Sequence, residues 1–441
     1  MLLRGGTVVT CDARDRVIVE DVLVRGREIA AVGSSEVAAR ARSPVRVLDA
    51  RGCAVIPGFV QAHVHLSQTL MRGMADDLPL LEWLRGRVWP LEAAHDEGTL
   101  SASAELGLAE AMLAGTTTIL DMGTVHGHDA VMDACVRAGV RALSGKAMMD
   151  GGDGVPSGLR ESTRESLDES ERLARTWRGA GDGRIGYAWA PRFLLSCSEA
   201  LVRGAVERAG ASAEIVHTHA AEHPAERDAV RRALGDDDVA VLRRWGVAGT
   251  RAVLAHGVEL RDDEAQTAAR DGTRVVHCPS ANLKLGSGIA RVAELDAMGV
   301  ALALGADGAP CNNNLDPWTE MRHAALLAKV RSGVAALPAR RTLRLATMDG
   351  ARALGLDAIV GSVEQGKRAD LVVARIDGPH AEPGGDVFSR LVYACGARDV
   401  RHVLVDGLLV VKDGEHQLLD VERVRARARV EARRLLDRAG I

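Results

Sequence analysis

Short apolar runs alternate with longer amphipathic segments along most of the sequence, and this alternation limits the fold more than any other feature. The apolar runs lie at residues 54–62, 116–122, 140–150, 185–193, 213–220, 251–258, 273–279 and 300–307. Polar turns and Ala-, Arg- and Glu-rich segments typical of helices, such as 198–210, follow the runs before the last. Repeated β–α alternation indicates a parallel sheet, and about eight repeats favour a closed (β/α)8 barrel, the TIM barrel, over a doubly wound sheet.

Strand-like segments also flank this region at both ends of the chain. The sequence predicts short antiparallel strands joined by Gly and Asp turns at residues 2–10, 16–33 and 45–58. The same pattern of short strands and turns recurs at residues 361–377 and 399–415. The predicted fold class is therefore α/β, a distorted (β/α)8 barrel with a small β-sandwich built from the two terminal segments. The predicted boundaries are 1–56 and 359–415 for the sandwich, 57–358 for the barrel, and 416–441 for a charged C-terminal helix.

Composition excludes several classes of protein. A net charge of −4 over 441 residues gives no basic footprint for nucleic acid or anionic lipid, and no apolar run reaches the length of a membrane span. The N-terminal stretch breaks into turn residues at once, unlike a signal peptide. The seven cysteines are scattered and form no CxxC pair, which is typical of reduced thiols. We therefore expect a cytoplasmic protein without nucleic-acid or membrane partners.

Histidines gather where the predicted strands end. His63 and His65 lie two residues apart at the end of the first strand, so their side chains point to the same side. The ends of later strands carry His217, His219, His256, His277 and Asp307. Functional residues of a TIM barrel lie at the C-terminal ends of its strands, so these side chains share one rim. One such histidine is commonly a hydrogen-bonded core residue, but four strands with histidine and a fifth with aspartate indicate a metal site.

Such a site suits a catalytic metal rather than a structural one. Three histidines and one carboxylate leave a coordination position open for water, and the metal lowers the pKa of that water until hydroxide is available near neutral pH. Glu222 lies three residues after His219, within reach of the site but not required as a ligand. We expect this carboxylate to take the water proton and deliver it to the substrate, as a glutamate that is not a metal ligand does in zinc deaminases.

The motifs around these residues resemble the amidohydrolase superfamily, in the branch that holds guanine deaminase, adenosine-type deaminases and triazine hydrolases. The resemblance runs through "PGFVQAHVH", "HTHAAE", "LAHG", "HCPSANLKLGSG", "LGADGAPCNNN" and "GSVEQGKRADLVV", and it covers essentially the whole chain. It implies that one metal is bound by His63, His65, His219 and Asp307. It also implies catalytic roles for Glu222 as proton shuttle, for His256 as the residue that orients the attacking water, and for Asp307, which holds that water as well.

The same resemblance implies one divalent cation per chain, usually Zn²⁺. A set of three histidines and one aspartate also accepts iron or manganese, so Fe²⁺ is a second candidate. Branches that bridge two metals use a carboxylated lysine after the fourth strand, where this chain has Arg192, and Lys146 lies on the third strand instead. His217 and His277 are left to support the ligands or to pack in the core. A relative that had lost its metal would lack ligands, and none is missing here.

Several motifs resemble guanine deaminases in particular. Gln68 follows the second histidine of the first strand by three residues, where that family reads the purine, and Arg192–Phe193 resembles its substrate-binding pair. Gln68 can donate and accept along one edge of a planar base, Arg192 can fork onto ring acceptors, and Phe193 can stack. Trp83 is expected to form a wall of the pocket. Plainer alternatives stay open, with Arg192 paired to a barrel carboxylate and with Phe193 and Trp83 packed in the core.

Other motifs depart from that family. "DGAPCNNNLDPWTEMR" and "ANLKLGSG" are closer to adenosine and S-adenosylhomocysteine deaminases, whereas Leu81 offers no polar group to a ribose. The main expectation is metal-dependent hydrolytic deamination of guanine, or a related purine base, to xanthine and ammonia. The alternatives are an adenosine-type nucleoside (adenosine, 5′-deoxyadenosine, S-adenosylhomocysteine or methylthioadenosine) and a triazine that loses ammonia or chloride. The partner is then a small heterocycle. A homodimer also stays open, because family members are often dimers or larger, although no stripe of the sequence demands it.

Overall fold

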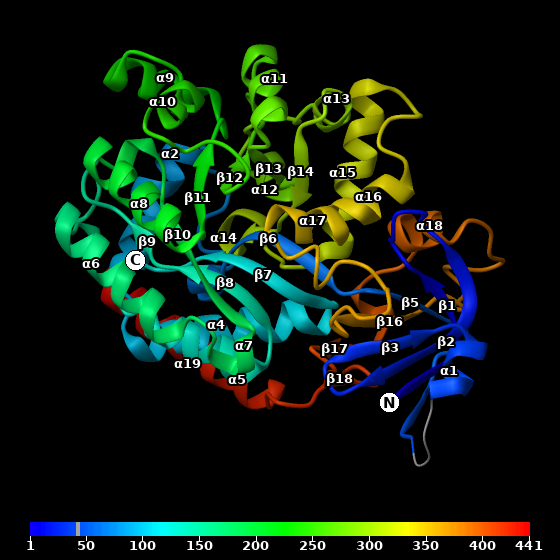
Figure 1. Ribbon diagram of the computed structural model, residues 1–441. Helices are drawn as coiled ribbons and strands as arrows, with labels where there is room; N and C mark the ends of the chain where they lie inside the picture. The colour runs from blue at the N-terminus through cyan, green and yellow to red at the C-terminus, as the bar shows by residue number, and fades with distance from the viewer. Residues whose placement is uncertain (41–44) are drawn as a thin grey trace.

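The central sheet confirms the predicted barrel. In the computed structural model, which describes residues 1–40 and 45–441, parallel strands follow one another around it in chain order (Figure 1). They are β6 (Phe59–His65), β7 (Thr116–Met122), β8 (Arg141–Gly145), β10 (Ile185–Pro191), β11 (Ile215–Ala220), β12 (Ala252–His256), β13 (Arg274–His277) and β14 (Ala301–Leu304), with β9 (Ala147–Met148) beside β10. After β14 the chain continues into β15 (Asp307–Gly308), which pairs with β6 and so brings the last strand back to the first.

Helices after the strands cover the outside of the barrel (Figure 1). They are α4 (Glu97–Leu113), α5 (Asp129–Ala138), α6 (Thr163–Trp177), α7 (Ala180–Gly183), α8 (Glu199–Ser212), α9 (Pro224–Leu234), α10 (Asp238–Arg244), α11 (Asp262–Asp271), α12 (Pro279–Lys284), α13 (Val292–Ala297), α14 (Ala309–Asn312), α15 (Pro317–Ser332), α16 (Ala339–Leu345) and α17 (Met348–Ala353). Local signals set several of their ends. Ser162 and Glu165 cap each other's backbone amides at the start of α6, and Gly139 ends α5 in the left-handed region.

Both ends of the chain enter one second sheet, as predicted. Its strands are β1 (Leu2–Val9), β2 (Val17–Arg25), β3 (Glu28–Val32), β4 (Val47–Asp49), β5 (Cys53–Pro57), β16 (Leu371–Arg375), β17 (Val400–Val405), β18 (Leu408–Lys412) and β19 (Glu415–His416). The N-terminal and C-terminal halves meet where β5 pairs antiparallel with β16 (Figure 1). Val22 and Ile29 of one half share a hydrophobic cluster with Leu404 and Leu409 of the other, so the sheet folds back on itself around its own core. The short helices α1 (Ser34–Arg40) and α18 (Val387–Ser389) flank it.

The apolar run 54–62 is not one strand, as the sequence suggested, but two strands in different sheets. Pro57 ends β5 in the terminal sheet, and Phe59 begins β6 in the barrel. Between them, Gly58 packs so closely that a Cβ atom would lie 2.1 Å from Oγ1 of Thr117. Continuous burial on both sides of the junction hides the change of sheet from a reading of hydrophobicity alone. The predicted boundaries at residues 57, 359 and 416 stay predictions.

The last helix, α19 (Val421–Ala439), lies against α4 on the outside of the barrel (Figure 1). Arg427 contacts Glu105 at 3.1 Å, and Arg438 contacts Asp96 at 2.6 Å. These ion pairs join the end of the chain to the helix that follows the first barrel strand. Within residues 1–40 and 45–441, no helix combines the length and the apolar character needed to cross a bilayer.

A buried ion pair joins the barrel to the terminal sheet. Nε and Nη2 of Arg141, at the start of β8, donate to the two carboxylate oxygens of Asp370 at 2.9 and 3.0 Å. Asp370 lies just before β16, and both side chains are at least 95% buried. A bidentate pair of this kind fixes both position and orientation, because two parallel hydrogen bonds leave little freedom to rotate.

We expect Arg141→Ala to lower the free energy of unfolding by about 3–5 kcal/mol, because the substitution leaves a buried carboxylate without its cation. Urea unfolding of the purified protein measures the change. Arg203→Ala is the matched control, since Arg203 makes an exposed pair with Glu199 on α8 and such pairs contribute little. Equal losses in the two variants would show that the buried pair does not join the two units.

Candidate active site

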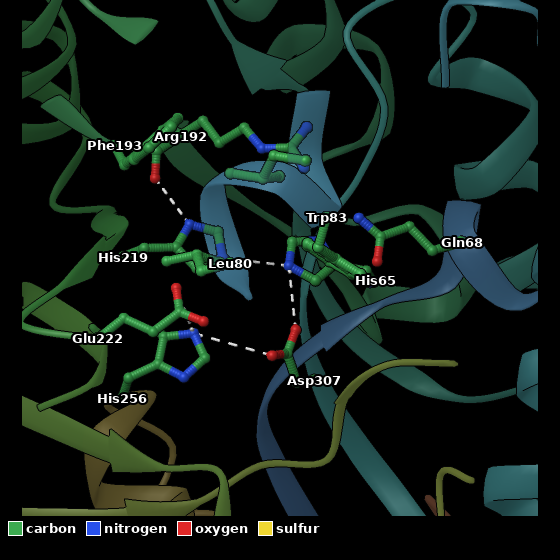
Figure 2. Close-up of a pocket in the computed structure, with 11 residues that line it drawn as sticks. His65, Gln68, Leu80, Trp83, Arg192, Phe193, His219, Glu222, His256 and Asp307 are labelled. Carbon is green, nitrogen blue, oxygen red and sulfur yellow. Dashed lines mark hydrogen bonds and ion pairs between the residues drawn. The ribbon is translucent and has the colours of Figure 1, made fainter. Parts of the chain in front are cut away.

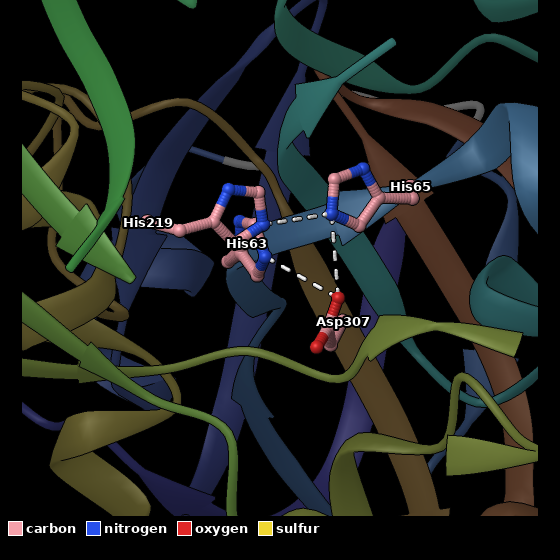
Figure 3. A group of neighbouring side chains, drawn as sticks. All are labelled: His63, His65, His219 and Asp307. Carbon is pink, nitrogen blue, oxygen red and sulfur yellow. Dashed lines mark hydrogen bonds and ion pairs between the residues drawn. The ribbon is translucent and has the colours of Figure 1, made fainter. Parts of the chain in front are cut away.

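Three segments bring the predicted metal ligands to one point. His63 and His65 come from β6, His219 from β11 and Asp307 from β15. Asp307 pairs with Val64, so its backbone lies next to the two histidines that flank this residue. One ligand atom from each of the four residues lies within 4.8 Å of all the others (Figure 3). The structure therefore assembles the set that the sequence predicted.

Backbone carbonyl groups fix the orientation of two of the imidazoles. Nδ1 of His65 donates to the carbonyl oxygen of Met122 at 2.7 Å, and Nδ1 of His219 donates to that of Arg192 at 2.8 Å. Because a carbonyl only accepts, the proton of each neutral ring is on Nδ1, and Nε2 carries a lone pair. The two Nε2 atoms face each other at 3.2 Å (Figure 3). Two lone pairs at this distance repel each other unless a cation lies between them.

His63 completes the same arrangement. Its Nδ1 contacts Nε2 of His217 at 2.8 Å, while its buried Nε2 has no hydrogen-bond partner among the described residues. Oδ1 of Asp307 lies 3.3 Å from that Nε2 and 3.4 Å from Nε2 of His65. Ligands of a tetrahedral zinc site lie about 2.0–2.2 Å from the metal, so they are about 3.3–3.5 Å from one another. The donor atoms thus fit a divalent cation in chemistry and in spacing.

Burial keeps these groups in the protonation states that a metal needs. It lowers the pKa values of His63 and His65 well below the ordinary range, and neighbouring histidines lower them further. Burial alone would raise the pKa of Asp307, but the surrounding imidazoles, His256 foremost, hold it below its usual value. The cluster therefore presents neutral imidazoles and an ionised carboxylate at neutral pH, which are the forms that coordinate metals.

Glu222 and His256 stand beside the cluster at the ends of β11 and β12. Nε2 of His256 lies 3.5 Å from Glu222 and 3.8 Å from Asp307, so the ring is placed between two carboxylates (Figure 2). Nδ1 of His256 contacts Oδ1 of Asn282 at 2.9 Å, which fixes the ring. Burial, followed by the charge of Asp307, raises the pKa of Glu222 well above that of an exposed glutamate. A carboxyl group in this state can hold a proton close to the place where chemistry would occur.

A narrow pocket opens onto these groups. It is lined by His65, Gln68, Leu80, Trp83, Leu84, Arg192, Phe193, His219, Glu222, His256 and Asp307. Figure 2 shows Glu222 and His256 on one side and Gln68 and Trp83 on another. The four residues predicted to contact substrate, Gln68, Trp83, Arg192 and Phe193, therefore lie in one pocket with the predicted catalytic residues.

A carboxylate that the sequence analysis did not identify holds two of these residues. Glu92, on the short helix α3 (Trp89–Ala93), accepts hydrogen bonds from Nε2 of Gln68 at 2.8 Å and from Nη1 of Arg192 at 2.5 Å. It is 6% exposed. Arg192 thus lines the pocket and also pairs with a carboxylate, which lies on α3 rather than on a barrel strand. Its contact with substrate stays a prediction. The signal in the sequence is an acidic residue inside the otherwise apolar run "VWPLEAA".

The apolar part of the pocket differs from the expectation at one position. Leu80 and Trp83 of α2 (Leu80–Trp83) line the pocket together with Leu84, but Leu81 faces a separate depression beside Phe193. Neighbouring residues of a helix point in different directions, about 100° apart. The apolar side chain of Leu81 therefore does not indicate whether the pocket accepts a sugar.

The remaining candidate residues surround the cluster without joining it. His217 supports His63 through the ring contact described above. His277 is outside the pocket, where burial and the nearby His256 lower its pKa to about 3. Nζ of Lys146 pairs with Glu161 and lies 3.4 Å from Oγ of Ser166, so its amino group is engaged elsewhere.

Comparison with known proteins gives a consistent family. The sequence model of the amidohydrolase family matches residues 54–410. Over 394 residues, the chain is 39% identical to a 5-methylthioadenosine/S-adenosylhomocysteine deaminase of Halobacterium salinarum, with 89% of each chain covered. It is also 40% identical over 390 residues to a 5′-deoxyadenosine deaminase of Methanothermobacter thermautotrophicus, with 88% of this chain and 89% of that relative covered.

Solved structures are similar over nearly the whole chain. The structure of an adenosine deaminase from Xanthomonas campestris with bound zinc matches with a TM-score of 0.92 and 34% identity, and 99% of this chain and 98% of that one are covered. For the guanine deaminase of E. coli the TM-score is 0.84 and the identity 26%, with 93% and 99% covered. The adenosine-type deaminases are thus more similar to this chain than the guanine deaminase is. The comparisons favour the nucleoside alternative over the guanine expectation.

We expect the purified protein to carry about one divalent cation per chain, and His219→Ala to lose most of it, because one of four ligands is then missing. Inductively coupled plasma mass spectrometry of the desalted proteins measures the content. His277→Ala is the control, since it removes a buried histidine from a strand end outside the cluster. Two cations per wild-type chain, or full occupancy in His219→Ala, would contradict this assignment.

Proposed function

The chain belongs to the amidohydrolase family, and we propose that it deaminates a 6-aminopurine nucleoside with one divalent cation per chain. As a member of this family with deaminase relatives, it is a hydrolytic enzyme that acts on C–N bonds. One observation carries the proposal. Glu222 and His256 line the same pocket as His65, His219 and Asp307 of the ligand set, so proton transfer and metal chemistry meet at one point.

The reaction exchanges an amino group for an oxygen. A divalent cation in the cluster would supply hydroxide near neutral pH, because it lowers the pKa of water. Glu222 takes the water proton and delivers it to the ring nitrogen beside the amino-bearing carbon. As the C–O bond forms, His256, whose Nδ1 is held by Asn282, orients the attacking oxygen through Nε2. Glu222 then takes the proton of the added hydroxyl group and passes it to the amino group, so the C=O bond forms as the C–N bond breaks. Ammonia leaves with a 6-oxopurine as the other product.

Several features support a purine as the substrate. Trp83 and Phe193 give aromatic surfaces for a planar ring. Gln68 and Arg192 supply polar contacts from the wall that Glu92 organises. Relatives that are 39–40% identical to this chain bear the names of methylthioadenosine, S-adenosylhomocysteine and 5′-deoxyadenosine deaminases, and these support a nucleoside with a modified 5′ position.

Guanine is the second candidate, because of the orientation of Gln68. Its Nε2 donates to Glu92, so Oε1 is left as a buried acceptor without a partner among the described residues. Guanine offers N–H donors at N1 and at its 2-amino group, whereas the ring nitrogens of adenine are acceptors. This unpaired acceptor of Gln68 favours guanine over an adenine nucleoside.

Ammonia release from a substrate panel tests the choice. The panel contains adenosine, 5′-deoxyadenosine, methylthioadenosine, S-adenosylhomocysteine, guanine and ammeline, each with the zinc-loaded protein. We expect kcat/KM for at least one nucleoside to exceed that for guanine about 100-fold or more, a ratio that a polar pocket can provide. Turnover of guanine without the nucleosides would overturn the nucleoside proposal in favour of the second candidate.

We expect Glu222→Gln to lower kcat by about 100- to 10,000-fold, because an amide cannot take and deliver the proton. Steady-state kinetics on the best panel substrate measures kcat and KM, and mass spectrometry measures the metal content, which should not change. Glu199→Gln, an exposed position on α8, is the matched control. A variant with near wild-type kcat would remove Glu222 from the proposed mechanism.

A further inference from the structure

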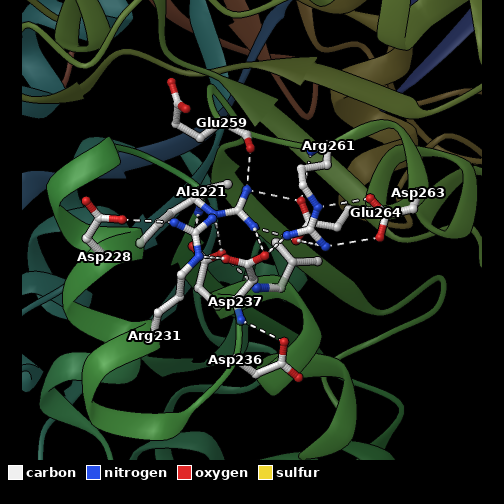
Figure 4. A network of polar contacts seen from close by, with 12 residues as sticks. Ala221, Asp228, Arg231, Asp236, Asp237, Glu259, Arg261, Asp263 and Glu264 are labelled. Atoms are coloured by element: carbon white, nitrogen blue, oxygen red, sulfur yellow. Dashed lines mark hydrogen bonds and ion pairs between the residues drawn. The ribbon is translucent and has the colours of Figure 1, made fainter.

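The residue before Glu222 has a strained backbone. Ala221 follows β11 and has φ of 52°, in the left-handed region that alanine rarely adopts. Its amide N–H donates to Oδ2 of Asp238 at 2.5 Å, and its carbonyl oxygen accepts the amide N–H of Glu259 at 2.9 Å. Figure 4 shows Ala221 and Glu259 at the edge of a dense group of charged side chains. Hydrogen bonds therefore fix both the N–H and the C=O group of Ala221.

Asp238 is built to hold that amide. It lies in the first turn of α10, is 1% exposed, and is 17 residues away along the chain. Its other oxygen, Oδ1, accepts the amide N–H of Val239 at 2.8 Å and lies 3.2 Å from Nε of Arg227. The buried carboxylate of Asp238 thus contacts Arg227 on one side and the strained turn at Ala221 on the other. The positive charge of Arg227 offsets the cost of burying this carboxylate.

Arg227 is in turn fixed from other elements. This arginine of α9 is 3% exposed, and its guanidinium donates to both oxygens of Glu264 on α11, at 3.1 and 2.5 Å. It also donates to the carbonyl oxygen of Glu259, whose amide holds Ala221. Figure 4 shows Glu264 and Glu259 converging on the same network. The network therefore spans three helices, and it ends at the backbone beside Glu222.

We propose that Asp238 is a positioning residue that holds the turn at Ala221 and so aims the carboxyl group of Glu222 at the reacting atoms. This inference rests on the proposed role of Glu222. Rotation about the Ala221 backbone would swing Glu222 away from His256, which lies 3.5 Å from it. The amide of Glu222 itself donates to Oε2 of the buried Glu226 at 3.2 Å. A misplacement of about 1 Å in such a group can cost about 100-fold in rate.

Asp238→Asn tests the proposal. An asparagine has one carbonyl oxygen, so it cannot accept the amides of Ala221 and Val239 together while it faces Arg227. We expect kcat to fall about tenfold or more, with KM within twofold of wild type and with the metal content unchanged. Hydrogen–deuterium exchange is expected to become faster in the peptide that holds Ala221 and Glu222. Asp238→Glu, which keeps the charge but moves the carboxylate, takes its place if the asparagine variant does not fold.

Asp237→Asn is the matched control. Asp237 belongs to the same network, where it pairs with Arg227, Arg231 and Arg261 (Figure 4), but none of its recorded contacts is with the 221–222 turn. We expect this variant to keep wild-type kcat and exchange. If the loss of any ion pair of this network lowered activity, Asp237→Asn and Asp238→Asn would lose the same share of kcat. That result would overturn the proposal.

A second substitution gives a rescue. Glycine adopts the left-handed region freely, so adding Ala221→Gly to Asp238→Asn should restore at least part of the lost kcat. Wild-type-like kcat in Asp238→Asn, or no recovery in the double variant, would contradict the positioning role. If the wild-type protein turns over nothing in the panel, the proposed function fails. The exchange comparison between Asp238→Asn and Asp237→Asn still decides whether Asp238 holds the turn.

Discussion

The Nε2 atoms of His65 and His219 face each other at 3.2 Å, and their lone pairs repel each other unless a cation lies between them. Two backbone carbonyls force the lone pairs of His65 and His219 inward, and a third ligand atom from Asp307 arrives through the pairing of β15 with β6. The strand pair that closes the barrel therefore also carries Asp307 to the cluster. Gly305 makes the closure possible, because a Cβ atom there would lie 2.7 Å from the carbonyl oxygen of His63.

The rim of the barrel concentrates backbone strain around this cluster. Ala221, His256 and Asp307 all have positive φ values, 52°, 79° and 64°, although none is a glycine. Each such residue costs of the order of 1–3 kcal/mol. The surrounding contacts hold them there: a buried carboxylate at Ala221, Asn282 at the ring of His256, and strand pairing at Asp307. Strain is thus found where side chains must leave the strand direction to face a common centre.

The sequence predicted a cluster of residues at the strand ends for one physical reason, whereas the choice of four of them as metal ligands came from the family resemblance. Side chains alternate along a strand, and parallel strands end at the same rim, so strand-end residues such as His63, His65 and Asp307 can be grouped without a structure. Glu92 and Asp238 could not be found in this way. They lie on helices, and their contacts with Arg192 and Ala221 depend on how those helices pack against the barrel. The direction of Leu81 on a four-residue helix was inaccessible for the same reason.

The wall formed by Gln68 and Arg192 presents an acceptor and donors together. Glu92 takes up one donor of Gln68 and one of Arg192, which leaves Gln68 as an acceptor while Arg192 keeps further N–H donors for a ring nitrogen. A wall that both accepts and donates suits many purines, so it separates bases poorly. The apolar side chains of Leu80 and Leu84 complete the pocket. Apolar surface favours a deoxy or thioether group over a hydroxyl, so selection among nucleosides would depend on this side rather than on the polar wall.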